Sequence, residues 1–246
     1  MKNKIPIIKH AGKLRTLNPS PASTILFEGD SFTSFRSKPC LDTWPWQRLT
    51  GAHYGYPERV GDWIFCNRPD LNINCHNGAV GGSIVNDILI RFPTITEPLK
   101  PGIVIMTIGG SDSTRGTPLA VVRSEICEYC SRLLDLCGGK VLYLGNFLPL
   151  HDASEPMRQK REEARPYTQA IAEVVDAHGG LAVDLGTVLV RKHEALVKLW
   201  PGHSISHDGN HFNPVGYEIV TSVVLRALGL MQMPGDPCEP GPMELS

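Results

Sequence analysis

The sequence predicts an α/β fold built around a parallel β-sheet. Five short runs have the apolar and β-branched composition of strands, and segments with the apolar period of helices lie between them. The third run, Ile-Val-Ile-Met-Thr-Ile at 103–108, is apolar almost without alternation, as expected of a strand that helices cover on both faces. Strands that alternate with helices pair in parallel through right-handed crossovers. The five expected strands are 24–28, 71–76, 103–108, 140–145 and 181–185.

Five strands of this kind favour a flavodoxin-like three-layer sandwich whose sheet has the order 2-1-3-4-5. Active sites in such sheets lie beyond the carboxyl ends of the strands, near the point where the strand order reverses. The loops that follow the first three strands should therefore meet at one place.

Sequence signals mark the beginnings of four helices. Pro57 suits the first turn of one helix, and Ser83 can cap a second. The stretch 117–137 carries apolar side chains in helical register, and Asn213 with Pro214 combines an N-cap with a first-turn proline. The charged run from Arg158 to Arg165 is interpreted as a solvated helix face.

Size and composition limit the classes of function. A chain of 246 residues fits one large domain, and 24 basic against 25 acidic residues leave no basic excess for a nucleic-acid partner. The sequence contains no run of 18 apolar residues, so we expect no membrane-spanning helix. Seven cysteines without an apolar signal-peptide core favour reduced thiols, so we expect a cytoplasmic location.

The two ends differ from the body of the chain. Residues 1–22 carry five Lys or Arg and no acidic residue, which predicts a basic N-terminal arm. Residues 233–246 are rich in Pro and Gly and are expected to be disordered. The segment 23–232 is expected to form the single domain.

Unusual residues gather where strands are expected to end. The segments 29–33, 77–83 and 109–112 are rich in Gly, Asn, Asp and Ser and follow the first three strands. Near the end of the chain, Asp208 precedes His211 by three positions in a segment too rich in Gly and Asn for a regular helix. Ser, His and Asp together make an activated nucleophile, because the histidine takes the serine proton and the carboxylate holds its tautomer.

These four blocks resemble those of the SGNH or GDSL hydrolase family, over about residues 24–225. A lone Gly-Asp-Ser is a common turn sequence, but four blocks in the right order are specific. The resemblance implies that Ser31 is the nucleophile, His211 the general base and Asp208 its orienting partner. Asp30 is expected to be structural, through hydrogen bonds to neighbouring loop N–H groups.

The resemblance also implies an oxyanion hole. In this family the hole takes an N–H at the serine (here Ser31), an N–H at a glycine of the second block (here Gly82), and a side-chain amide of the third block. Ser111 stands where the family has that asparagine. A hydroxyl can donate but rotates freely, and losing a preorganised donor lowers the rate by about 100- to 1000-fold. Ser111 is thus either a replacement donor or a structural residue.

The implied activity is hydrolysis of carboxylic esters through an acyl-enzyme, with neither a metal nor an organic cofactor. The expected substrates are small-molecule or carbohydrate esters, because some members of the family deacetylate carbohydrates. Trp44 and Trp46, in the aromatic segment after Ser31, are candidate substrate-binding residues; packing of that segment onto the body is an equal alternative. Two other functions stay open: an acyltransferase on the same triad, and a binding module on a catalytically weakened scaffold, which Ser111 suggests.

Three further patterns compete with this interpretation. His203, His207 and His211 recur every four residues, which would align metal ligands on a helix, but the surrounding Pro and Gly oppose a helix there. Cys127 and Cys130 have the spacing of a redox pair but fall inside an amphipathic helix, which favours core thiols. The glycines after the second and third strands could hold a phosphate, but no Lys follows in P-loop spacing.

Overall fold

The computed structural model describes residues 16–33, 55–145 and 153–231, and these form the predicted parallel sheet. Its five strands have the order β2-β1-β3-β4-β5, and every neighbouring pair is parallel. The predicted fold class and strand order are therefore confirmed. The strands are β1 Thr24–Gly29, β2 Asn74–Asn77, β3 Ile103–Thr107, β4 Lys140–Gly145 and β5 Leu181–Asp184.

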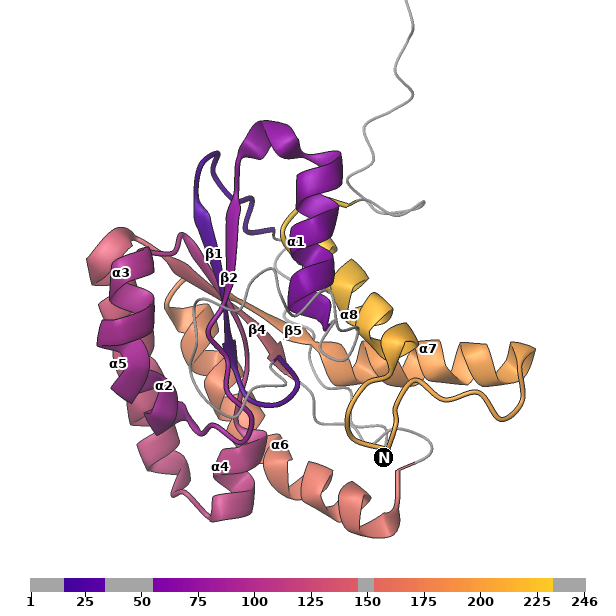
Figure 1. Cartoon of the computed structure of the whole chain (residues 1–246). Coiled ribbons are helices and arrows are strands. Elements are labelled where there is room, and N and C mark those ends of the chain that lie inside the picture. The colour runs from indigo at the N-terminus through magenta and orange to yellow at the C-terminus, as the bar shows by residue number, and fades with distance from the viewer. Residues whose placement is uncertain (1–15, 34–54, 146–152, 232–246) are drawn as a thin grey trace, which may run out of the picture.

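Helices cover both faces of the sheet (Figure 1). One face packs against α1 (Tyr56–Asn67), α7 (Leu185–Leu199) and α8 (Pro214–Ala227). The other face packs against α2 (Val85–Arg91), α5 (Leu119–Cys137) and α6 (Glu155–Ala177). The shorter elements are the 3₁₀ turn η2 (Pro69–Leu71), the π-helical turn η3 (Phe92–Thr96), α3 (Glu97–Leu99) and α4 (Gly110–Arg115).

Strand β3 shows why its sequence is apolar throughout. Ile103 and Ile105 enter the core under α1, α7 and α8, whereas Val104 and Met106 enter the core under α2, α5 and α6. All four side chains are buried. Because successive side chains of a strand point to opposite faces, a strand covered on both sides has no polar face.

Two predicted boundaries are wrong. The second strand begins at Asn74 rather than at 71, because η2 occupies its expected start and Asn72 then takes a left-handed conformation with φ of 46°. Ser83 does not cap α2, which begins after Ile84; the Ser83 hydroxyl instead accepts a hydrogen bond from Arg91. The predicted cap at Asn213 is confirmed, since its side chain accepts from two N–H groups of the first turn of α8.

The turn after β1 depends on a glycine. Gly29 has φ of 125°, and a Cβ placed on it would lie 2.0 Å from the carbonyl oxygen of Thr107 on the neighbouring strand β3. Only glycine permits both this backbone conformation and this close approach. The turn carries the chain from the sheet into Asp30 and Ser31.

Most of the predicted basic arm and all of the predicted tail lie outside the described residues, as do Trp44 and Trp46. Within the described ranges, none of the helices combines the length and the apolar character that a bilayer crossing requires.

Candidate active site

Ser31, His211 and Asp208 form one hydrogen-bonded chain at the carboxyl end of β1. The Ser31 Oγ lies 3.1 Å from Nε2 of His211, although the two residues are 180 positions apart. The other ring nitrogen, Nδ1, lies 2.8 Å from Oδ2 of Asp208. When Nδ1–H donates to the carboxylate, Nε2 carries the lone pair that can accept the serine proton. The structure thus brings together the three residues that the sequence singled out.

A tight loop before α8 presents His211. Ser206 and Phe212 form an antiparallel bridge, and the His207 N–H donates to the His211 carbonyl across it at 2.9 Å. The Ser206 hydroxyl accepts from the Gly209 N–H at 3.0 Å. This geometry differs from a helix, so the four-residue spacing of the histidines does not align them on one face. Within the described part of the chain, no three His, Cys, Asp or Glu side chains are grouped so as to hold a metal ion.

Asp208 is held as a carboxylate. Partial burial opposes its ionisation, but hydrogen bonds from the His211 ring and from the N–H groups of His211 and Asn210 outweigh that effect and lower the pKa of Asp208 to about 2. The Asp208 side chain is therefore a carboxylate at neutral pH. A fixed negative charge at this place stabilises the imidazolium form of His211.

Asp30, directly before Ser31, is buried. Its Oδ1 accepts hydrogen bonds from the Phe32 N–H at 3.0 Å and from the Thr107 hydroxyl at 3.2 Å. Burial raises the pKa of Asp30 to about 6, although both hydrogen bonds and the charge of Arg161 act in the opposite direction. The loop hydrogen bond expected from the sequence is therefore present, and burial leaves the pKa of Asp30 at about 6.

The free energy of unfolding should depend on pH because of the raised pKa of Asp30. Because the pKa of Asp30 rises from 3.8 in the unfolded chain to about 6 in the fold, the native state holds its proton more tightly, and stability is lost as the pH rises through 6. Asp30→Asn keeps an acceptor but cannot ionise. Between about pH 4 and pH 7.5, the variant should gain roughly 2–3 kcal/mol relative to the native protein, measured by urea unfolding. Parallel pH dependences of the two proteins would contradict the raised pKa.

The expected oxyanion donors lie in the segments that follow β1, β2 and β3. Gly82 has φ of 76°, and its carbonyl, in the peptide that follows the proposed donor N–H, accepts from Arg115 at 2.8 Å. Among the described residues, neither the Ser31 N–H nor the Gly82 N–H has a hydrogen-bond partner. Ser111 lies in the first turn of α4, partly exposed, and its hydroxyl likewise has no partner within the described ranges. All three groups are therefore able to donate to a ligand.

The sequence analysis missed Arg161. The run from Arg158 to Arg165 was expected to be a solvated helix face, yet Arg161 is 8% exposed and contacts the Phe32 ring and the Asn210 side chain. The correction has a sequence signal, because Arg161 falls in helical register with the buried positions Ala164 and Thr168 of α6. The many charged residues in this run masked the helical spacing of its buried positions, so the whole run was interpreted as solvent-exposed.

Phe32 is the second residue that the sequence analysis missed. Its ring stacks on the His211 ring, with centroids 5.8 Å apart and planes 28° apart, and it contacts Phe212 as well. Phe32, Asp30 and Arg161 also line a cavity of about 20 Å³. That volume corresponds to about one water molecule.

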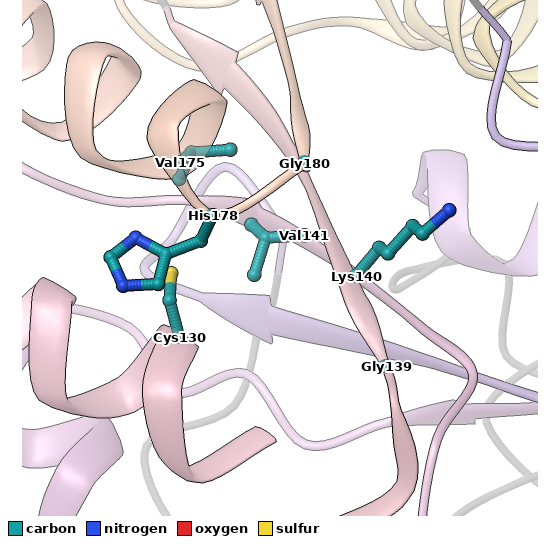
Figure 2. A pocket seen from close by; sticks show the side chains of 7 residues that line it. All are labelled: Cys130, Gly139, Lys140, Val141, Val175, His178 and Gly180. Atoms are coloured by element: carbon teal, nitrogen blue, oxygen red, sulfur yellow. The ribbon is translucent and has the colours of Figure 1, made fainter. Parts of the chain in front are cut away.

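A second hollow lies at the other end of the strands, away from Ser31 and His211 (Figure 2). It is found where β4 and β5 begin, between the ends of α5 and α6, and it is too small for a water molecule. Burial raises the pKa of Cys130 there to about 12, so this thiol stays protonated. The expectation of core thiols holds for Cys130, which is buried, and is wrong for Cys127, which is exposed on the same helix.

Comparisons with known proteins agree with this geometry. The model of the GDSL-like Lipase/Acylhydrolase family matches residues 27–219. No curated protein matches the sequence. Among solved structures, the chain is similar to a Parabacteroides merdae protein described as a GDSL-like lipase, with 18% identity, coverage of 88% of this chain and 100% of the other, and a TM-score of 0.71.

Two further structures are similar. One is an acetylxylan esterase from Geobacillus stearothermophilus, with 21% identity, coverage of 86% of this chain and 96% of that one, and a TM-score of 0.68. The other is an alpha/beta hydrolase enzyme from the metagenome of Lake Arreo, with 20% identity, coverage of 87% and 98%, and a TM-score of 0.68. At these identities the structures support the fold, and the family match covers most of the chain. The chain therefore belongs to the GDSL-like lipase/acylhydrolase family.

Proposed function

We propose that this protein is a serine esterase that hydrolyses carboxylic esters through an acyl-enzyme. The observation that carries the proposal is the hydrogen-bonded chain from Ser31 through His211 to Asp208. Membership of an esterase and acylhydrolase family supports the reaction class. Further support comes from the acetylxylan esterase, whose catalytic mutants replace one serine, one aspartate and one histidine, with the aspartate three positions before the histidine, as here.

In the proposed mechanism, the Ser31 Oγ attacks the ester carbonyl carbon while Nε2 of His211 takes the hydroxyl proton. Asp208 stabilises the resulting imidazolium. The tetrahedral oxyanion receives hydrogen bonds from the N–H groups of Ser31 and Gly82, with Ser111 as the third donor. His211 then gives its proton to the leaving alcohol, and a water molecule repeats the two steps on the acyl-enzyme to release the acid.

For the substrate, we propose acetylated carbohydrates or other small esters with a short acyl group. The support is that one of the similar structures is an acetylxylan esterase. We propose Trp44 and Trp46 as sugar-stacking residues on the basis of the sequence alone, since both lie outside the described ranges.

A serine-directed fluorophosphonate probe, followed by peptide mapping, tests the proposal. We expect covalent labelling of Ser31 and hydrolysis of acetate esters in a panel that varies acyl length and includes acetylated xylo-oligosaccharides. No labelling of the folded protein would favour the binding module on a weakened scaffold. An ester product in place of free acid, in the presence of an alcohol acceptor, would favour the acyltransferase.

Ser111→Ala measures the third oxyanion donor. If the hydroxyl donates to the oxyanion, kcat should fall roughly tenfold while KM changes little, because this hydrogen bond strengthens only as charge develops. Initial rates against substrate concentration give both constants, and Ser113→Ala in the same helix is the matched control. An unchanged kcat would mean that Ser111 is structural and that two backbone donors suffice.

A further inference from the structure

Arg161 connects the two loops that carry the proposed nucleophile and base. It projects from α6, a third element, and its side chain is almost fully buried. Its guanidinium carbon lies 4.8 Å from the centroid of the Phe32 ring, on the residue directly after Ser31. The same group donates a hydrogen bond to Oδ1 of Asn210, the residue directly before His211. One cation therefore contacts the immediate neighbours of both reacting side chains.

Each of the two residues that Arg161 contacts is connected to the His211 ring, Phe32 directly and Asn210 through Asp208. On one side, Phe32 lies under the guanidinium and also stacks on the imidazole. On the other side, the Asn210 N–H donates to Oδ1 of Asp208 at 2.9 Å, and Oδ2 of that carboxylate receives the imidazole Nδ1. The position of the ring thus depends on Phe32 through its face and on Asp208 through its edge.

The charges around Arg161 explain why a cation is kept in this place. Burial lowers the pKa of Arg161, and the carboxylates of Asp30 and Asp208 act in the opposite direction. A buried guanidinium without such partners would be strongly destabilising. An apolar side chain could fill the same volume without the desolvation cost of a buried charge. What it could not provide are the contacts with the Phe32 ring and the Asn210 side chain, which need a planar cation with several N–H donors.

We propose that Arg161 is a positioning residue that holds His211 in register with Ser31 for proton transfer. The inference rests on the proposed serine mechanism, and Arg161 acts through Phe32 and Asn210 rather than on the substrate. The Ser31 Oγ and the His211 Nε2 are 3.1 Å apart, and they sit on loops far apart in the sequence. A displacement on the order of 1 Å at such a contact lowers a rate by about 100-fold.

The test compares two substitutions of Arg161 in the full chain, with p-nitrophenyl acetate as substrate. Arg161→Gln removes the charge and the planar fork, and we expect kcat to fall roughly 10- to 100-fold while KM stays within about twofold. Arg161→Lys keeps the charge but not the fork, and should recover only part of the loss. The rate of Ser31 labelling by the fluorophosphonate should fall in parallel with kcat.

Arg165→Gln is the matched control, because Arg165 lies one turn further along α6 and pairs with Glu162 at the surface. It should leave kcat and the labelling rate unchanged. If Arg161→Gln does not fold, Asn210→Ala removes the same hydrogen bond from the loop side and should lower kcat about tenfold with unchanged KM. Where both fold, the double variant should lose less than the product of the two single losses, because the residues share one contact.

An unchanged kcat in folded Arg161→Gln, or a rise in KM alone, would overturn the positioning role. A native protein that neither hydrolyses the ester nor is labelled at Ser31 would instead overturn the proposed function. The two failures are therefore distinguishable in one set of measurements.

Discussion

Ser31→Ala should abolish ester turnover while the protein keeps its stability. Removing the nucleophile of a serine hydrolase lowers kcat by roughly 10⁴-fold or more, because no other group in the chain of hydrogen bonds can form the acyl-enzyme. The hydroxyl is partly exposed and its hydrogen bond is to His211, so little packing is lost. Hydrolysis of p-nitrophenyl acetate and the thermal midpoint, measured on the same sample, check both parts of this expectation.

Ser222→Ala is the control for the loss of a serine hydroxyl. Ser222 lies on α8, and its hydroxyl donates to the Glu218 carbonyl one turn earlier in that helix. This variant should keep the native rate. Activity near the native level in Ser31→Ala would exclude the serine mechanism and with it the roles proposed for His211 and Asp208.

The fold followed from the sequence where one physical cause dominates. Cover on both faces favours apolar residues in β1 and β3, and both strands, apolar apart from a few positions such as Glu28, were predicted within one residue of their observed ends. The start of β2 was mispredicted because Leu71 and Ile73 alternate like a strand, although Pro69 and the left-handed Asn72 form a turn. Local backbone chemistry outweighed the apolar pattern there.

The site was predictable only in part, for a similar reason. Ser31, Asp208 and His211 stand in short motifs whose spacing the chemistry restricts, and the structure brings them together. Arg161 and Phe32 stand in no motif. Their contacts arise from the packing of α6 against two loops, which depends on tertiary structure and leaves only a helical period in the sequence.

A buried ion pair behind the site also escaped prediction. Glu28, in the mostly apolar strand β1, is fully buried. Its carboxylate accepts hydrogen bonds from two nitrogens of Arg91, and the shorter joins the guanidinium Nη2 to Oε2 at 2.6 Å. Arg91 donates as well to the Ser83 hydroxyl at 2.9 Å and to the Gly29 carbonyl at 3.3 Å. Since Gly29 leads to the Ser31 loop and Ser83 follows Gly82, the pair joins the bases of two loops of the site.

Glu28→Gln should be the most destabilising single substitution of this pair, by about 3–5 kcal/mol in the free energy of unfolding from urea titrations. A guanidinium stays protonated in proteins, so the variant leaves a buried cation with neutral acceptors only. In Arg91→Met, by contrast, the Glu28 carboxyl can take up a proton, which limits the loss. Glu162→Gln, at an exposed pair, should change little. A smaller loss in Glu28→Gln than in Arg91→Met would show that packing, rather than the unpaired charge, determines the stability of this region.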